Sequence, residues 1–312
     1  MTTDPLVVEI LRSGVVESTH LVDVALVDAT GSLLAAAGDP MVHAALRSSV
    51  KPIQARAARA AGWTPASQAH LAIACASHNA EPAHLRAVRH VLAEAGLDET
   101  ALACPPAWPF LPRDVAGAGR ERRAQHNCSG KHAGFLAACV AAGWPLETYL
   151  EPEHPLQVGV RAAIEAATGM RALDELVDGC GAPTLVFPVA AIARMFASVH
   201  GTTEADAMRA HPFLIAGSER LDTALLSAGI VTKAGAEGLS CATFEHEGRV
   251  VGLALKVRDG TTRARVAACT HLLVDLGALD RDAIEPSFLA PPTLGGGHPV
   301  GAAIVRGELT FA

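Results

Sequence analysis

The stretch LSCATFEHEGRVVGLALKV, residues Leu239 to Val257, predicts a β-hairpin. It contains two apolar runs, 239–244 and 250–257, that flank the polar segment Glu245–Gly248. β-Branched and aromatic residues are enriched in strands, and a glycine between two such runs is typical of a turn. This part of the chain therefore indicates an antiparallel sheet.

Apolar runs at the other end of the chain also predict strands. Leu6–Leu11 and His20–Asp28 have strand-like composition, and the turn at Thr30-Gly31 leads into a short return strand. The C-terminal tail, with Gly295–Gly297, is predicted as a loop that leads to one last short strand. Strands at both ends indicate a sheet built from the two termini.

The middle of the chain is predominantly helical in pattern. In residues 81–95, Leu85, Val88, Val91 and Leu92 recur at helical spacing. The run 71–76 fits either a buried strand or the start of a helix. The predicted helices are residues 48–61, 81–95, 133–142, 155–168, 203–210, 218–228 and 261–276. We therefore expect a mixed α/β (α+β) fold with a helical subregion inserted between the terminal strands, and we treat residues 1–312 as a single domain.

Composition excludes several classes of protein. Half of the 312 residues are hydrophobic and 18% are charged, which excludes a disordered chain. A net charge of −7 without a basic run argues against nucleic acid and anionic membranes as partners. The longest uncharged apolar stretch, residues 133–146, is too short to span a membrane. Seven cysteines without a C-x-x-C pair, and no signal-peptide pattern, indicate free thiols in the cytoplasm.

Lysine is scarce in this sequence. Only four of the 25 basic residues are lysines, at positions 51, 131, 233 and 256. A desolvated lysine can lose its proton, whereas arginine effectively cannot. The four lysines are therefore the first candidates for acid–base chemistry.

The segment Arg47-Ser48-Ser49-Val50-Lys51-Pro52 combines a hydroxyl and an amine at a predicted helix start. A spacing of three residues places Ser48 and Lys51 on one helix face. Free N–H groups at the helix N-terminus can hold an oxyanion, and a neutral lysine can activate a serine nucleophile. The structural alternative is that Ser48 caps the helix and Lys51 is solvated.

Two further segments concentrate polar side chains. In Cys75-Ala76-Ser77-His78-Asn79, Ser77 either assists proton transfer or caps the following helix. The segment HNCSGKHAG, residues 126–134, runs directly into an apolar helix, so its polar groups are expected to surround the helix start. It is not a P-loop, because Gln125 stands where the first glycine would be. We interpret this cluster as functional.

Two later segments combine reactive side chains with glycine. In Asp178-Gly179-Cys180-Gly181, Cys180 either shares a metal such as zinc with Cys128 or is one of two buried thiols. Lys233 precedes a glycine-rich turn and the C-terminal hairpin, where substrate can approach the backbone closely. Lys256, at the end of the hairpin, is equally consistent with a structural partner of an acid.

Taken together, these segments are similar to known families. S-x-x-K at a helix start, a later serine motif and K-x-G before the last strands resemble the serine β-lactamase arrangement. More specifically, the chain carries six motifs in order, which are R-S-x-x-K-P, C-A-S-H, N-C-S-G-K-H-A-G, D-G-C-G-x-P-T, K-x-G-A-E-G and L-K-x-x-D-G. This ordered set resembles the thermolabile, Rhizobium-type (class 3) L-asparaginase II family, from the region of Val16 to that of Gly301.

The resemblance implies a serine β-lactamase/glutaminase-like fold, a homodimer, and hydrolysis of L-asparagine to L-aspartate and ammonia. It implies two Ser–Lys pairs, Ser48 with Lys51 and Ser77 with Lys233, with Ser48 favoured as nucleophile by its helix start. It also implies a modulatory zinc bound by a metal set. That set consists of Cys128, Lys131 and Cys180.

A substrate with an α-ammonium and an α-carboxylate needs charged anchors. Asp178 or Glu237 suits the ammonium, and Arg47 or His132 suits the carboxylate, while Asn127 adds an amide to the same polar cluster. These assignments rest on charge and on proximity in the sequence.

Two other functions remain open at this stage. One is a β-lactamase-like serine hydrolase that acts on another amide, such as glutamine or a peptide. The other is a non-enzymatic zinc or thiol sensor. Release of ammonia from asparagine separates the asparaginase from the first alternative, and loss of activity in Ser48→Ala argues against the second.

Overall fold

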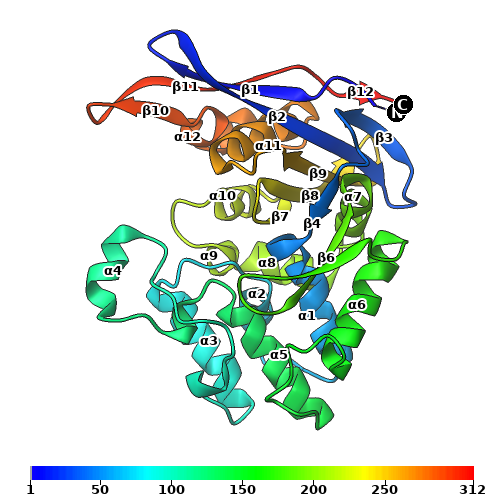
Figure 1. The fold of residues 1–312 in the computed structure, drawn as a ribbon, viewed down its shortest axis with the longest axis vertical. Coiled ribbons are helices and arrows are strands. Elements are labelled where there is room, and N and C mark those ends of the chain that lie inside the picture. The colour runs from blue at the N-terminus through cyan, green and yellow to red at the C-terminus, as the bar shows by residue number, and fades with distance from the viewer. Residues whose placement is uncertain (1) are drawn as a thin grey trace.

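The computed structural model describes residues 2–312, and its largest feature is an antiparallel β-sheet (Figure 1). Its strands are β1 (Leu6–Arg12), β2 (Val15–Asp28), β3 (Leu33–Ala37), β7 (Val231–Ala234), β8 (Leu239–His246), β9 (Arg249–Val257), β10 (Pro292–Gly295), β11 (His298–Arg306) and β12 (Thr310–Phe311). Hydrogen-bonded neighbours follow the order β10-β11-β1-β2-β9-β8-β7, and β3 pairs with both β2 and β12. A smaller sheet, in the order β4-β6-β5, consists of β4 (His43–Ala45), β6 (Pro183–Pro188) and β5 (Asp174–Val177).

The hairpin predicted at residues 239–257 is present as β8 and β9. Its register pairs Leu239 with Lys256 and His246 with Arg249. The turn is shorter than the predicted four-residue segment, because only Glu247 and Gly248 lie outside the strands. Both have positive φ, +49° and +75°, the geometry that matches the twist of two strands joined by two residues.

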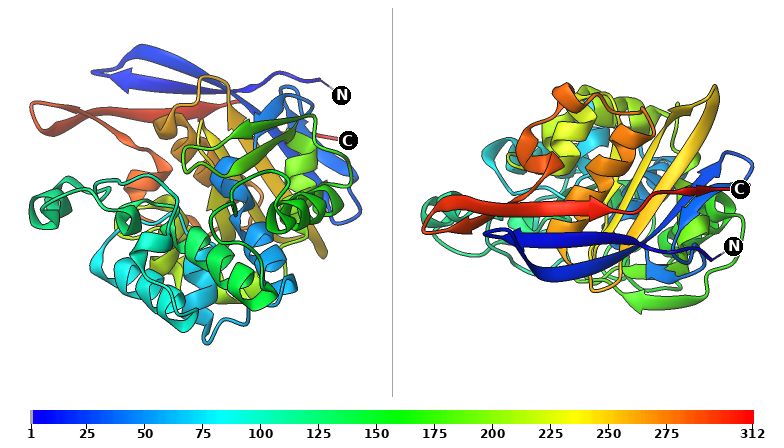
Figure 2. Two further views of the ribbon diagram at one scale, coloured as in Figure 1. Left: turned by 60° about the horizontal axis from the view of Figure 1, so that its bottom comes forward. Right: turned by 90° about the horizontal axis from the view of Figure 1, so that it is seen from above.

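The prediction of a sheet assembled from both termini is confirmed. β1 pairs with β2 on one side and with β11 on the other, and the blue and red strands lie side by side (Figure 2). The tail differs from the prediction, because it forms a hairpin of β10 and β11 around the glycines 295–297. Pro292 is tolerated in β10 because this strand lies at the edge of the sheet.

Most of the helices lie between these strands in the sequence. They are α1 (Lys51–Ala60), α2 (Gln68–Ala74), α3 (Pro82–Glu94), α4 (Pro112–Ala118), α5 (Ser129–Ala142), α6 (Pro155–Thr168), α7 (Val189–Ala197), α8 (Thr203–Ala210), α9 (Pro212–Ile215), α10 (Leu221–Ser227), α11 (Thr262–Asp275) and α12 (Pro286–Leu289). Short 3₁₀ helices are η1 (Arg47–Val50), η2 (Glu99–Ala101), η3 (Arg123–Gln125) and η4 (Arg281–Ala283). Every predicted helix is present with small shifts at its ends, and residues 71–74 of the ambiguous run 71–76 are the last part of a helix, α2. None of the helices in residues 2–312 is long and apolar enough to cross a membrane.

The sheet is covered by helices on both faces. Successive residues of a strand point to opposite faces. Ala25 and Val27 of β2 accordingly belong to a core that includes residues of α7, whereas Val24 and Leu26 belong to a second core with α11. The first core continues into α1, α2 and α5, so it joins the sheet to the inserted helices. The candidate catalytic residues lie along this junction.

A glycine at the start of α5 allows two helices to approach closely. A Cβ atom on Gly130 would lie 2.1 Å from the carbonyl oxygen of Ile73 in α2. We expect Gly130→Ala to lower the free energy of unfolding by about 1–3 kcal/mol, because the clash is with rigid backbone. Urea denaturation measures this loss. The matched control is Gly159→Ala in α6, where the added Cβ meets nothing within 4 Å and alanine favours the helix. Equal stability of the two variants would contradict the prediction.

Candidate active site

Ser48 and Lys51 lie at the junction of η1 and α1, where a helix start is predicted. Arg47 has a φ of +46°, a left-handed conformation that is strained for a residue other than glycine and redirects the chain into η1. The residue that caps α1 is Val50, so Ser48 is not its N-cap. The side chain of Lys51 is only 1% exposed. The structural alternative of a capping serine and a solvated lysine is therefore wrong.

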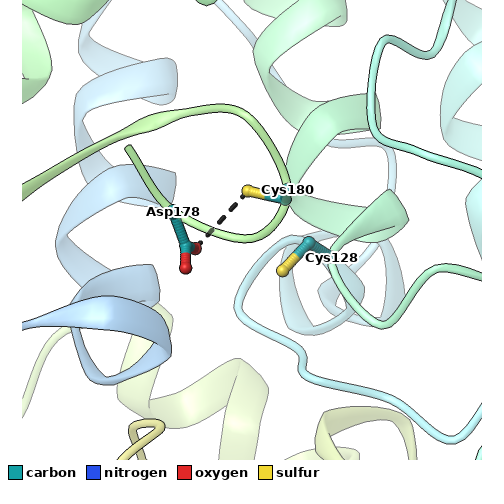
Figure 3. A group of neighbouring side chains, drawn as sticks. All are labelled: Cys128, Asp178 and Cys180. Atoms are coloured by element: carbon teal, nitrogen blue, oxygen red, sulfur yellow. Dashed lines mark hydrogen bonds between the residues drawn. The ribbon is translucent and has the colours of Figure 1, made fainter. Parts of the chain in front are cut away.

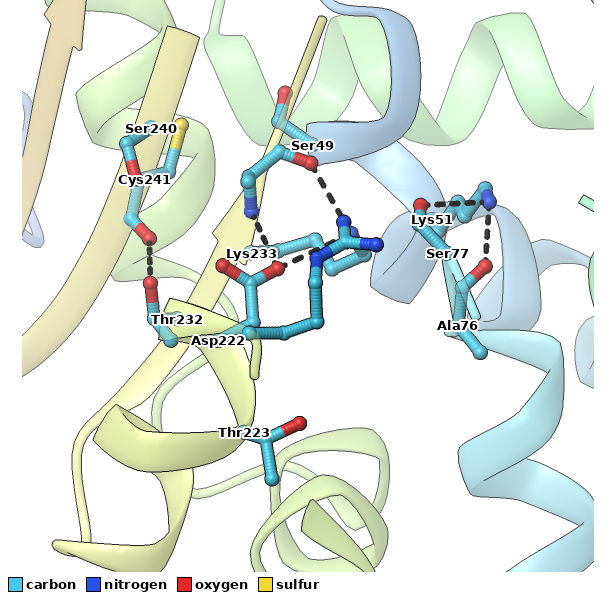
Figure 4. A network of polar contacts seen from close by, with 12 residues as sticks. Ser49, Lys51, Ala76, Ser77, Asp222, Thr223, Thr232, Lys233, Ser240 and Cys241 are labelled. Carbon is cyan, nitrogen blue, oxygen red and sulfur yellow. Dashed lines mark hydrogen bonds and ion pairs between the residues drawn. The ribbon is translucent and has the colours of Figure 1, made fainter. Parts of the chain in front are cut away.

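The amine of Lys51 contacts Ser77 directly. Its Nζ lies 2.8 Å from Ser77 Oγ and donates to the carbonyl oxygen of Ala76 (Figure 4). It also donates to the carbonyl oxygen of Asn127. Ser77 is buried in the segment that follows α2, and the N-cap of α3 is Glu81. In residues 2–312 no hydrogen bond joins the Ser48 hydroxyl to Lys51. The structure thus connects Lys51 to the serine that is distant in sequence.

Lys233 occupies the middle of β7 and is fully buried. Its Nζ lies 3.4 Å from Asp222 Oδ2 and 3.0 Å from the carbonyl oxygen of Ala234 (Figure 4). Asp222 is held in place by the Ala234 N–H, which donates to the same oxygen at 2.9 Å. Since η1 packs against β7, the segment that carries Ser48 lies next to the strand that carries Lys233.

Burial and charge set the protonation of Lys233. Burial lowers the pKa of Lys233 to about 8, and the positive charge of Lys51 acts in the same direction, although Asp222 opposes both. Burial alone would raise the pKa of Asp222, but Lys233 and Arg265 hold it below its ordinary value. A neutral amine at Lys233 is therefore accessible near neutral pH. Asp222 was not among the predicted site residues, because its only signal in the sequence is an acid inside a predicted helix.

The thiols of Cys128 and Cys180 meet at the start of α5, although 52 positions separate them in the chain. Together with a carboxylate oxygen of Asp178, their ligand atoms lie within 4.8 Å of one another (Figure 3). The Cys180 thiol donates to Asp178 Oδ2 at 3.5 Å, and Lys131 Nζ lies 3.0 Å from Cys180 Sγ. The predicted metal set is therefore brought together, with Asp178 as an additional oxygen donor.

This cluster stabilises a thiolate. The adjacent Cys180 thiol lowers the pKa of the Cys128 thiol well below its usual range, and the positive charges of Lys51 and Lys131 contribute. In turn, Cys128 and burial raise the pKa of Cys180. Burial alone would lower the pKa of Lys131, but Cys180 and Cys128 raise it above its ordinary value. Lys131 therefore carries its proton in this arrangement.

Arg47 and Asp178, two candidate anchors for substrate, form an ion pair with each other. Burial would raise the pKa of Asp178, but Lys131 and the hydrogen bond from Arg47 keep it below its ordinary value. The backbone of Arg47 is tied to the same loop, because its N–H donates to Thr184 Oγ1 at 3.0 Å. The pair therefore places the Arg47 guanidinium next to the segment of Ser48 and the Asp178 carboxylate next to the thiols of Cys128 and Cys180.

The other candidate anchors occupy different environments. His132 is buried, and its Nδ1 lies 2.6 Å from the hydroxyl of Tyr149, a residue that sequence analysis missed. Its Nε2 is buried without a hydrogen-bond partner among the described residues. Burial lowers the pKa of His132 well below its ordinary value, so the ring is neutral. Asn127 and Glu237 are exposed, and Glu237 lies in the turn after β7 with a φ of +55°.

A sequence model of the L-asparaginase II family matches residues 8–305. The chain belongs to the L-asparaginase II family. The expectation drawn from the ordered motifs is therefore confirmed at the level of the family.

Solved structures show more distant similarity. A structure of Mglu in its native form has 16% identity and a TM-score of 0.44, with 84% of this chain and 66% of that chain covered. A structure of Mglu in its glutamate form has 17% identity and a TM-score of 0.35, with 84% of this chain and 62% of that chain covered. This L-asparaginase II chain thus spans slightly less than two thirds of these structures. In the comparison with curated proteins nothing matched.

Proposed function

We propose that this chain is an L-asparaginase that hydrolyses the side-chain amide of L-asparagine to L-aspartate and ammonia. The observation that supports it most is the buried contact of 2.8 Å between Lys51 Nζ and Ser77 Oγ beside the start of α1, in a chain of the L-asparaginase II family. The same proposal includes the serine β-lactamase/glutaminase-like fold and a homodimer. Analytical ultracentrifugation measures the homodimer directly.

The proposed chemistry is acyl transfer through a serine. Ser48, on the strained turn before α1, attacks the amide carbon, and its proton passes to Lys51 when that amine is neutral. The amide nitrogen then takes up the proton and leaves as ammonia when the C–N bond breaks, and water hydrolyses the resulting serine ester to release aspartate and restore the hydroxyl. Lys51 Nζ is hydrogen-bonded to Ser77 Oγ, so this pair provides a route for the proton between the nucleophile and the leaving group. Lys233 is the second base, with Asp222 as its partner.

Substrate recognition is proposed for the charged residues around this centre. Arg47 offers a guanidinium for the α-carboxylate, and Asp178 or the exposed Glu237 offers a carboxylate for the α-ammonium. The neutral His132 and the Asn127 amide are hydrogen-bonding groups for the rest of the substrate. These roles follow from the charge of each residue, and Glu237 lies near Lys256 and Gly260 instead of beside Lys51 and the thiols.

A zinc ion fits the cluster of Cys128, Cys180 and Asp178. The lowered pKa of Cys128 favours a thiolate, and two sulfur atoms with one carboxylate oxygen are a donor set that zinc accepts. The raised pKa of Lys131 assigns it first to balancing the thiolate charge, and it becomes a ligand only after it loses its proton. When bound, zinc supplies a Lewis acid that can polarise a carbonyl oxygen.

The zinc site predicts a loss of metal in a single-thiol variant. Cys180→Ser is expected to lower zinc affinity at least about tenfold, because serine remains protonated and binds zinc weakly. Mass spectrometry of metal content after dialysis, with competition by a chelating dye, measures the affinity. Cys139→Ala removes a buried thiol further along α5 and serves as the control. Equal zinc content in the wild type and Cys180→Ser would contradict the site.

Ammonia release tests the proposed function. The purified protein is assayed with L-asparagine and L-glutamine, with and without added zinc, beside Ser48→Ala. We expect turnover of asparagine that is lost in the variant. A folded, zinc-loaded protein that releases no ammonia from either amide would overturn the asparaginase proposal, and turnover of glutamine alone would replace it with a glutaminase.

A further inference from the structure

Residues 107–122 form a closed segment beside the start of α3. Ala107 and Arg122 pair through two backbone hydrogen bonds of 3.2 Å, and α4 lies between them (Figure 1). The Phe110 N–H donates to the carbonyl oxygen of Asn79 at 2.9 Å, so the segment touches the loop that carries Ser77. This closed segment and α3, together with Ala80 and Gln125, line a half-open cavity of about 260 Å³.

Three polar groups in this cavity lack partners. Asp114 Oδ2, Arg122 Nε and Gln125 Oε1 all belong to residues that line the cavity, and none has a hydrogen-bond partner within residues 2–312. Gln125 is only 2% exposed. Leaving such a group unpaired costs about 1–3 kcal/mol, so three in one cavity indicate a site built for a polar occupant.

The charges of the three groups specify the occupant. A carboxylate and an amide oxygen accept hydrogen bonds from an ammonium group, and a guanidinium N–H donates to a carboxylate. Pro82, Leu85 and Pro109 supply apolar wall for a short side chain. We propose that this cavity binds a free α-amino acid as a zwitterion, with its ammonium on Asp114 and Gln125 and its carboxylate on Arg122. Its volume is below that of pockets for drug-sized ligands, about 300–1,000 Å³.

This second site shares a wall with the candidate active site. Ala80 lines the cavity, and its N–H donates to His78 Nδ1 at 3.1 Å. His78 follows Ser77 and, through Nε2, lies 3.0 Å from Ser129 Oγ, whose hydroxyl donates to the Ala124 carbonyl next to Gln125. An amino acid in the cavity therefore lies against the segment that positions Ser77, while its ammonium and carboxylate bind to Asp114, Gln125 and Arg122 and not to Ser77.

Calorimetric titration with L-aspartate, which carries no side-chain amide to hydrolyse, tests the proposal. We expect Gln125→Leu and Asp114→Asn each to bind one aspartate fewer per chain than the wild type, or to bind it at least tenfold more weakly at that site. Gln125→Leu is expected to fold, because the amide oxygen that it removes has no partner to lose. Arg120→Gln is the control, an exposed residue of the same closed segment that does not line the cavity.

Succinate, which lacks the ammonium, is the second probe and is expected not to bind at this site. Identical aspartate stoichiometry and affinity in the wild type and both variants would overturn the proposal, as would equal binding of succinate at the site that the variants remove. Binding is read without turnover, so this result is independent of whether asparagine is hydrolysed. A chain that releases no ammonia yet loses one aspartate site in Gln125→Leu would retain the amino-acid site and lose only the proposed function.

Discussion

Replacing Lys51 with methionine is expected to lower kcat for amide hydrolysis by about 10²–10⁴-fold, the usual contribution of a positioned acid–base group. Methionine fills a similar volume but provides no amine, so Ser77 loses the donor at 2.8 Å from its hydroxyl. The site is buried, and no solvent-exposed lysine can take its place. Steady-state ammonia release at saturating asparagine measures the loss.

The matched control is Lys256→Met. Lys256 is one of the four lysines and lies at the end of β9, where its Nζ donates to the carbonyl oxygen of Val257 at 2.5 Å. It makes no hydrogen bond with either serine among the described residues. We expect this variant to keep kcat within about threefold of the wild type. A folded Lys51→Met protein with wild-type kcat would contradict the role of Lys51.

Lys233 is expected to make kcat/KM rise as the pH increases through about 8. Burial lowers the pKa of Lys233 to about 8, and below this value the ammonium has no lone pair to accept a proton. Above it the neutral amine can act as a base, so the rate increases with pH and then reaches a plateau. Measurements of kcat/KM between pH 6.5 and 9.5 define this limb.

Two variants and a control test whether Lys233 causes the rise of kcat/KM with pH, which is the limb defined above. Lys233→Arg keeps the positive charge at all these pH values, and we expect it to lose the limb together with about 10²-fold or more of the rate. Asp222→Asn removes the acid that favours the charged lysine, so the limb should move to lower pH. Asp275→Asn, an exposed carboxylate beside His271, is the control for a general charge effect. A limb unchanged in Lys233→Arg and Asp222→Asn would show that another group titrates.

Local sequence was sufficient for much of the fold. The hairpin of β8 and β9 follows from two apolar runs around a glycine turn, and α6 and α8 begin and end at the predicted residues. These features depend on contacts between residues close in the chain, which periodicity and turn residues record directly. Both elements of the small sheet's β5–β6 pair were missed, because short strands of four and six residues carry little pattern.

The candidate site also combines features that the sequence predicted with contacts that it did not predict. The sequence alone identified Ser48, Lys51, Ser77, Lys233 and the two thiols as chemically relevant, and the ordered motifs identified the L-asparaginase II family. The residue types and their positions near predicted helix starts were enough to identify these residues as candidates. The sequence also placed Lys51 one turn after Ser48, which favours a pair between them. In the structure the lysine is in contact with Ser77.

Only the tertiary structure decided which groups meet. Lys51 reaches Ser77 because α1 packs against α2, and Lys233 lies beside Asp222 because α10 packs against β7. The meeting of Cys128, Cys180 and Asp178, and the three unpaired groups around the amino-acid cavity, likewise join segments far apart in the chain. Local pattern records burial and backbone preference, whereas hydrogen bonds and pKa values depend on distances that arise only when the segments pack together.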